Sequence, residues 1–393
     1  MDPVTNPFRP GAGRRPPVLA GRERLLSSFD VAVQIAEKYG EGDRSWVLNG
    51  LRGVGKTVLL NELLSRANTR KWIVAKVEAS KNKPLREVLA AELVKATRTA
   101  TGRHPGGSKL ERALRVVRSF SLSLGTSGIS IGASVEPERG VADSGRFGDD
   151  LTELLATMGD ASLDVRVGTL ILVDELQEAS AEDLEAINMA VHALGQAADP
   201  LPVLFVGAGL PSLPAQLADA ASYAERLYDY QPIGLLSAED VRTALTEPCV
   251  SSGTSWDEDA LEAAVGLARG YPYFVQAIGK HVWDQAAGPA IHLEDVEVGG
   301  SRARDEIDAG LYRSRWERAT VAQRRMLLGM AELRSDDAVE IGDLATYLGK
   351  NRTSDLSVAR RELINKGLVY APERGLVAFT VPGMADFILG QDN

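Results

Sequence analysis

A glycine-rich stretch that ends in lysine and threonine carries the clearest chemical signal in this 393-residue sequence. It fits the pattern G-x-x-x-x-G-K-[ST], with Gly50 at its start and Gly55, Lys56 and Thr57 at its end. Residues 45–48 before it predict a short buried strand, and residues 58–64 after it predict an amphipathic helix. Glycines in such a loop let backbone N–H groups point at phosphate oxygens, and the helix N-terminus adds positive charge. The alternative is a structural glycine-rich turn, which this strand–loop–helix context disfavours.

The residue types in this loop assign a role to each polar side chain. Lys56 would neutralise charge on the β- and γ-phosphates of a nucleoside triphosphate, and Thr57 would offer a hydroxyl ligand to Mg²⁺. The ion keeps most of its other positions for water and phosphate. The rest of the predicted phosphate-binding set follows the loop backbone and comprises Gly50, Leu51, Arg52, Gly53, Val54, Gly55 and Val58.

A second motif places two carboxylates at the end of an apolar run, about 120 residues after the loop. Residues 169–173 are continuously apolar after Thr169, as in a central parallel strand that is buried on both faces. Asp174 would hold Mg²⁺ through its hydration shell, and Glu175 would orient and deprotonate a water molecule in line with the γ-phosphorus. A strand that ends in a charged turn is the alternative, and the phosphate loop upstream favours the metal-binding interpretation.

Composition limits the classes of protein that the chain can be. Cys249 is the one cysteine and the four histidines are scattered, which excludes an intrachain disulfide and disfavours a His or Cys metal site. The sequence has no apolar run long enough for a membrane span and no apolar signal segment, so we expect a cytoplasmic protein without membrane contact. Net charge is −10 overall but +1 over residues 311–393, so any nucleic-acid contact has to be local to the C-terminal part.

The last 80 or so residues change character. Residues 320–333, 341–348 and 354–366 predict three helices, and residues 367–380 predict a β-hairpin with its turn at Pro372 to Gly375. Three helices followed by a hairpin is the plan of a winged helix, whose third helix can enter the major groove of duplex DNA. The candidate DNA contacts lie on or beside that helix and at the tip of the wing: Arg352, Arg360, Arg361, Lys366 and Arg374. The alternative is a winged helix that binds protein.

The motifs together, in this order, resemble the AAA+/STAND P-loop ATPases of the archaeal-ATPase and origin-initiator type. The resemblance implies an α/β fold: a three-layer P-loop core with a parallel sheet in the order 5-1-4-3-2, a helical lid and a C-terminal winged helix. It places the core with its N-terminal arm at residues 1–235, the lid at 236–310 and the winged helix at 311–393. It implies ATP and Mg²⁺ as cofactors, with the nucleotide between core and lid.

The same resemblance suggests three less specific sites. Phe8, Val18 and Gly21 in or after the proline-rich arm become candidates for contact with adenine, although a solvated tail is the plain alternative. Pro272 in the Gly-Tyr-Pro turn would sense the nucleotide, although proline also simply favours a helix start. Arg226 would reach the γ-phosphate of a neighbouring copy in a homo-oligomer, or else form a surface ion pair.

Two features depart from, or add to, the expected pattern. The strand predicted at residues 201–206 leads into Gly207, Ala208 and Gly209, where such ATPases usually have a polar sensor residue, which questions efficient hydrolysis but not binding. Alternating apolar residues at 119–136 predict a β-hairpin insertion in the core, either structural or a contact for DNA or a partner.

Two functions of different class remain open. In the first, the chain is a Mg²⁺-dependent ATPase that acts as a nucleotide-driven switch and repositions the winged helix on duplex DNA or on an unknown protein partner. In the second, it is a nucleotide-binding regulatory scaffold with negligible hydrolysis, whose winged helix docks protein. The two carboxylates at the strand end favour the first, and the glycines at the sensor position favour the second.

Overall fold

The chain divides into two structural units that each draw on separate stretches of the sequence. The computed structural model describes residues 1–11, 13–123, 136–334 and 338–391. The core unit comprises Arg22–Gly50 and Lys56–Ile233, and the lid unit comprises Met1–Gly21, Leu51–Gly55 and Gly234–Asn393. The middle of the glycine-rich loop therefore groups with the lid unit, whereas both of its ends belong to the core unit.

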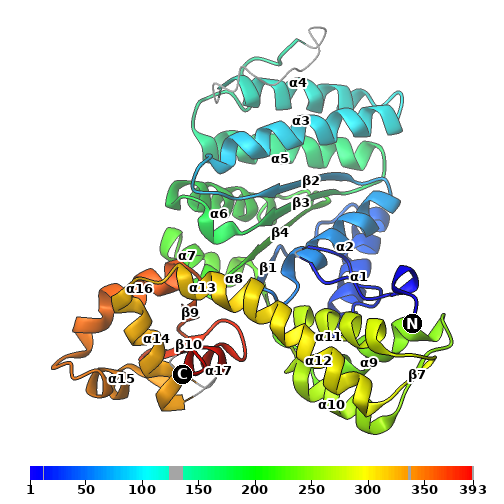
Figure 1. Ribbon diagram of the computed structural model, residues 1–393. Coiled ribbons are helices and arrows are strands. Elements are labelled where there is room, and N and C mark those ends of the chain that lie inside the picture. The colour runs from blue at the N-terminus through cyan, green and yellow to red at the C-terminus, as the bar shows by residue number, and fades with distance from the viewer. Residues whose placement is uncertain (12, 124–135, 335–337, 392–393) are drawn as a thin grey trace. The chain divides into compact units, whose positions relative to one another are not determined.

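A parallel sheet forms the centre of the core unit (Figure 1). Its strands are β1 (Trp46–Asn49), β2 (Ile73–Glu78), β3 (Thr169–Asp174), β4 (Val203–Gly209) and β5 (Asp229–Pro232), in the order β2-β3-β4-β1-β5. Every residue of β3 and β4 is buried, as the apolar runs predicted. The order read from β5 is 5-1-4-3-2, so the predicted core fold is confirmed.

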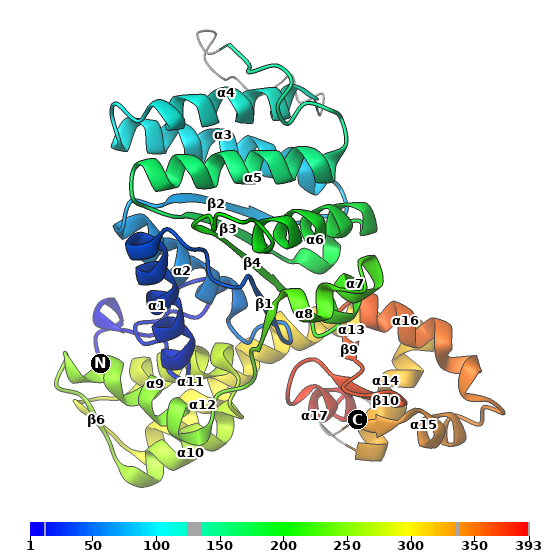
Figure 2. The ribbon, with the colours of Figure 1, turned by 180° about the vertical axis from the view of Figure 1, so that it is seen from behind.

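Helices surround this sheet. Those of the core unit are α1 (Glu23–Tyr39), α2 (Lys56–Thr69), α3 (Leu85–Arg103), α4 (Ser108–Ser123), α5 (Phe147–Asp164), α6 (Ala181–Gly195), α7 (Leu213–Ala220) and α8 (Ala224–Leu227), with a 3-10 turn η2 (Leu176–Glu178). Helix α2 packs on β2, β3 and β4, and α5 packs on β3 and β4. In both views α3, α4 and α5 lie together beyond β2 (Figures 1 and 2).

The predicted hairpin at 119–136 is wrong in its first part. Residues 119–123 continue α4 as helix, and the rest of the proposed hairpin lies outside the described residues apart from Glu136. The apolar residues Ala113, Val117 and Phe120 recur at helical spacing, and the Phe120 ring stacks on Phe147 with 6.1 Å between centroids. Phe120 and Leu122 therefore lie in the last turn of an amphipathic helix, with Phe120 on its buried side and Leu122 on its exposed side.

The N-terminal half of the lid unit is mostly helical. It contains η1 (Pro3–Thr5), α9 (Ala238–Val250), α10 (Glu258–Ala268), α11 (Pro272–Gln285), α12 (Leu293–Ile307), a π-helical segment (Asp308–Tyr312) and α13 (Arg313–Glu317), with short strands β6 (Ser255–Trp256) and β7 (Ala290–Ile291). Ser237 caps α9, because its hydroxyl accepts from the Asp240 N–H while the Asp240 carboxylate accepts from the Ser237 N–H.

The C-terminal part of the lid unit has the element order expected of a winged helix. It runs α14 (Val321–Arg334), β8 (Val339–Glu340), α15 (Ile341–Tyr347), η4 (Thr353–Leu356), α16 (Ser357–Asn365), β9 (Val369–Tyr370), β10 (Leu376–Phe379) and α17 (Met384–Leu389). The strands form an antiparallel sheet in the order β8-β10-β9. The three predicted helices and the hairpin are present, and β8 and α17 add to them.

The N-terminal arm is an ordered part of the lid unit. Asn6 donates to the Lys280 carbonyl at 3.0 Å and to the Asp284 carboxylate at 2.8 Å. The Phe8 ring, 2% exposed, lies so close to Gly279 that a Cβ on that glycine would be 2.5 Å from it. The arm is thus anchored on α11 and is not a solvated tail.

Replacing Phe8 by alanine should release the arm, because the ring is its largest buried anchor. We expect a loss of about 3 kcal/mol in stability of the lid unit and faster tryptic cleavage after Arg14, the arm arginine that is not followed by proline. Val4→Ala is the matched control, since Val4 lies in the same arm but is 82% exposed. Equal cleavage rates and equal thermal midpoints for the two variants would contradict the anchoring role.

Candidate nucleotide-binding site

The glycine-rich loop has the backbone conformation that a phosphate cradle requires. Gly53 and Gly55 have φ of +83° and +96°, in the left-handed region that favours glycine. The side of Gly55 on which a Cβ would project is open, with nothing within 4 Å. Helix α2 begins directly after it at Lys56, so the N–H groups of its first turn and its positive dipole end lie at the loop.

Lys56 is held at the base of this loop. Its side chain is only 5% exposed, and its ammonium donates to the Gly50 carbonyl at 2.9 Å. The Gly50 N–H in turn donates to the Gly209 carbonyl at 3.1 Å, which fixes the start of the loop to the end of β4. The sequence therefore places a buried positive charge where an anion can replace a backbone carbonyl as its partner.

Asp174 and Glu175 lie at the end of β3, as predicted. Asp174 is 4% exposed, and its Oδ1 accepts from the Glu175 N–H at 2.9 Å. Glu175 itself is half-buried and has φ of +49°, a left-handed conformation that costs energy in a residue with a side chain. Such strain persists where the surroundings enforce it, as they do at functional sites.

Strand topology brings the two motifs to one edge of the sheet. Asn49 pairs with Gly209 and Val173 pairs with Gly207, so β1, β4 and β3 end at nearly the same level. One strand separates β1 from β3, so their ends are roughly 10 Å apart. The ends of β1 and β3, both in the core unit, are therefore far enough apart for a phosphate and a hydrated metal ion.

The side chains here suit Mg²⁺. Thr57 and Asp174 offer hard oxygen donors, and Mg²⁺ takes few protein ligands because it keeps water and phosphate. Nowhere in the described residues do three or more His, Cys, Asp or Glu side chains gather as a metal cluster. Asp174 is buried next to the edge where phosphate would enter, so a cation would also balance its charge.

Sequence reasoning missed Gln177. Its Nε2 donates to Glu175 Oε2 at 2.6 Å, and its Oε1 accepts from the Leu210 N–H at 3.1 Å. Gln177 lies in η2, two residues after Glu175, and this closeness in sequence was the only indication of a role in the site. Its contact with the end of β4 depends on the tertiary fold.

In the lid unit, the Gly-Tyr-Pro turn meets the middle of the loop. Pro272 is the first residue of α11, as expected of a helix start. The Tyr271 hydroxyl donates to the Arg52 carbonyl at 2.8 Å, and it would be 1.9 Å from a Cβ placed on Gly53. Burial raises the pKa of Tyr271 to about 12, so the hydroxyl stays a donor at neutral pH.

Most of the core unit is similar to a known family of ATPase domains. The sequence profile of the AAA ATPase domain matches residues 18–206, which include the loop and both carboxylates. This part of the chain is therefore similar to the AAA ATPase domain. A second profile, described as a domain of unknown function (DUF8462), matches residues 309–388. No curated protein sequence matches the chain.

Solved structures share the fold of this chain along most of its length. The Walker-type ATPase PABY2304 of Pyrococcus abyssi is 16% identical with a TM-score of 0.59, covering 98% of this chain and 99% of that one. The ORC2 protein of Aeropyrum pernix, in ADPNP and ADP complexes, is 15% identical with a TM-score of 0.58 and covers 97% of each chain. At this identity the likeness concerns the fold, and it agrees with the AAA+ type inferred from the motifs.

The structure separates Arg226 from the other predicted residues of the candidate site. Arg226 is exposed on α8, before β5 begins, whereas the loop follows the end of β1. It lines a cleft of about 640 Å³ with Arg44, His192 and Tyr223, at the edge of the sheet where strands start. Because parallel strands place starts and ends at opposite edges, Arg226 does not share its own chain's site. Its action on a second copy stays a prediction.

The proposed adenine contacts belong to the lid unit. Phe8 is buried against α11, so its ring has no face left for a base, which corrects that expectation. Val18 packs partly buried on the lid core. Gly21, with φ of +71°, lies against the Asp240 carboxylate, 2.7 Å from where its Cβ would be. Base contacts by Val18 and Gly21 stay predictions.

The candidate DNA contacts fall into two groups. Arg352, Arg361 and Arg374 are exposed. Arg360 donates to the Leu376 carbonyl at 3.1 Å, and Lys366 donates to Arg318 and Gln323 oxygens at 2.9 and 2.7 Å. These last two side chains hold α16 against its neighbours, so the exposed arginines are the better candidates.

Lys56→Ala should lower ATP affinity by at least about 100-fold, or roughly 2.7 kcal/mol, because it removes the buried charge next to the phosphates. Equilibrium binding of a fluorescent ATP analogue measures this. Lys95→Ala is the control, since Lys95 is an exposed partner of Glu92 on α3. Unchanged affinity in Lys56→Ala would show that the loop is not the binding site.

Proposed function

We propose that this protein is an ATP-driven switch in which ATP and Mg²⁺ bound at the loop change the contacts of the lid unit. One observation carries the proposal. A buried lysine, a threonine at a helix start and two carboxylates gather at one edge of the parallel sheet, from segments more than 100 residues apart. That donor set suits a triphosphate and its metal.

Each side chain has a part in hydrolysis. Lys56 would exchange the Gly50 carbonyl for phosphate oxygens. Thr57 and Asp174 would hold Mg²⁺, which would supply positive charge against the phosphates. The Glu175 carboxylate, whose Oε2 accepts from Gln177, would accept the proton of the attacking water. The half-buried position of Glu175 limits competing water.

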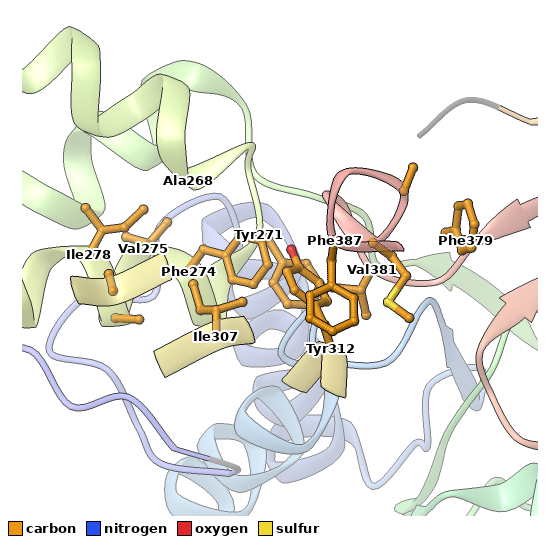
Figure 3. Close-up of a cluster of buried hydrophobic side chains, with 14 of the residues drawn as sticks. Ala268, Tyr271, Phe274, Val275, Ile278, Ile307, Tyr312, Phe379, Val381 and Phe387 are labelled. Atoms are coloured by element: carbon orange, nitrogen blue, oxygen red, sulfur yellow. The ribbon is translucent and has the colours of Figure 1, made fainter. Parts of the chain in front are cut away.

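Contacts within the lid unit support transmission of the nucleotide state. Tyr271, which binds the Arg52 carbonyl, starts a row of aromatic rings that ends on α17 (Figure 3). Ring centroids are 4.7 Å apart for Tyr271 and Phe274, 6.2 Å for Phe274 and Tyr312, and 5.5 Å for Tyr312 and Phe387. A shift of the loop would therefore alter packing up to the C-terminal helix.

A second contact path joins the same loop to the C-terminal part. The Arg52 guanidinium lies against Gly367, with Nε 2.9 Å from where a Cβ would be. Arg315 Nη1 donates to the Gly367 carbonyl at 3.0 Å. The turn between α16 and β9 is thus contacted by a residue of the phosphate loop, which supports control of this region by the nucleotide.

Glu175→Gln should bind Mg²⁺-ATP within about twofold of wild type but lose at least about 100-fold in turnover, because an amide cannot accept the proton. Phosphate release and nucleotide affinity are measured on the same samples. Glu185→Gln, on the exposed side of α6, is the control. Wild-type turnover equal to that of Lys56→Ala would refute the ATPase and favour a nucleotide-binding scaffold.

For the partner, we propose duplex DNA bound by the C-terminal part. Three exposed arginines support this proposal. Arg352 directly precedes η4, Arg361 lies on α16, and Arg374 lies in the turn of the β9–β10 hairpin. A recognition helix and a wing use such positions on the groove and the phosphate backbone. A protein partner is the alternative, since residues 311–393 have a net charge of only +1.

Arg361→Ala and Arg374→Ala should each weaken duplex binding and reduce the slope of log affinity against log salt by about 1. Fluorescence anisotropy over a salt series measures both. Arg302→Ala on α12 changes the charge equally and serves as the control, because Arg302 is exposed outside the C-terminal part. No binding at low salt would refute the DNA proposal and favour a protein partner.

A further inference from the structure

The end of β4 carries no polar side chain of its own, yet a polar group lies there. Gln177, from η2 after β3, has its carboxamide between Glu175 and the residue that follows β4. Its Oε1 is 2.6 Å from where a Cβ of Gly209 would be. The carboxamide therefore lies directly over the last residue of β4, where a side chain on Gly209 would project.

The glycines at this strand end serve to make space. Neither Gly207 nor Gly209 has positive φ, so backbone conformation does not require glycine at these positions. A Cβ at Gly207 would be 2.6 Å from Leu176 Cδ2, and one at Gly209 would be 2.7 Å from Leu213 Cδ2. Both glycines thus accommodate side chains that pack against the end of β4, and η2 supplies Leu176 and Gln177.

The orientation of the Gln177 amide follows from its partners. The Leu210 N–H can only donate, so Oε1 faces it, and Nε2 then faces the Glu175 carboxylate. A second carboxylate, Glu178, is 3.5 Å from Nε2 and thus a weaker acceptor. The Gln177 amide thus has a hydrogen bond at each polar atom: Oε1 with Leu210, directly after β4, and Nε2 with Glu175, the proposed base.

We propose that Gln177 is a positioning residue that ties Glu175 to the end of β4 and takes the place of the polar residue this strand lacks. This inference rests on the proposed ATPase function. Gln177 Nε2 donates to Glu175 Oε2, while Gln177 Oε1 accepts from the Leu210 N–H. The position of the Glu175 carboxylate is therefore coupled to the end of β4 through Gln177.

The variants Gln177→Ala and Gln177→Glu test this role. Alanine removes the anchor, and glutamate keeps the shape but cannot donate to Glu175. Both should lower the single-turnover hydrolysis rate about 10- to 100-fold, with ATP affinity within about twofold of wild type. Gln196→Ala, an exposed glutamine at the end of α6, is the matched control.

A gain-of-residue variant separates the two interpretations of the glycines. If β4 merely lacks a polar residue, Gly209→Asn should raise turnover. If Gln177 fills that position, Gly209→Asn should lower turnover by displacing the carboxamide, and adding Gln177→Ala should cause little further loss.

The outcomes distinguish this inference from the proposed function. If wild-type turnover exceeds that of Lys56→Ala but Gln177→Ala turns over ATP as fast as wild type, the positioning role is overturned and the ATPase stands. A fall in affinity as large as the fall in rate also overturns it, since it indicates general damage to the site. Wild-type turnover equal to Lys56→Ala overturns the ATPase and this role with it.

Discussion

Two charges buried at one edge of the sheet impose the main constraint on this structure. Lys56 and Asp174 are almost excluded from water, and an unpaired buried charge costs several kcal/mol. Backbone groups contact both: the Lys56 ammonium donates to the Gly50 carbonyl, and Asp174 accepts from the Glu175 N–H. Neutral dipoles are weaker partners than phosphate and Mg²⁺. A bound metal–triphosphate would therefore give Lys56 and Asp174 charged partners, which bind more strongly than neutral backbone groups.

The parallel sheet makes this arrangement feasible, since it collects strand ends that are distant in sequence. Strand β4 lies between β1, which leads into the loop, and β3, which leads into the carboxylates, so its end lies between the two motifs. Side chains at Gly207 and Gly209 would collide with Leu176, Gln177 and Leu213. The two glycines therefore leave space that Leu176 and Gln177 occupy. The end of β4 has no polar side chain of its own, but in the folded chain the η2 segment supplies one, Gln177.

The features that sequence predicts well are those with local causes. The loop, the strand before Asp174 and the helix start at Pro272 each follow from residue type and spacing, and the strand order followed from the family resemblance. Phe120 was misplaced because two residues at the end of a helix also satisfy strand alternation. Phe8 was misplaced because an aromatic residue in a proline-rich arm has no period to indicate its burial. Gln177 could not be found, because its role depends on space left by a glycine on another strand.

The glycine-rich loop belongs to both units, and this is the strongest structural reason to expect coupling. Gly50 bonds to β4 in the core unit, while Arg52 and Gly53 contact Tyr271 in the lid unit. Coupling requires that a ligand contact two states differently. Phosphate bound by the loop N–H groups would restrain the same peptides whose carbonyl holds Tyr271. Burial lowers the pKa of Arg315, and Arg52 adds to this as a second positive charge nearby, so negative charge at the loop would relieve a repulsion within the lid unit. Nucleotide binding would thereby change the energy of the contacts around Tyr271 and Gly367 without any direct contact with the C-terminal helices.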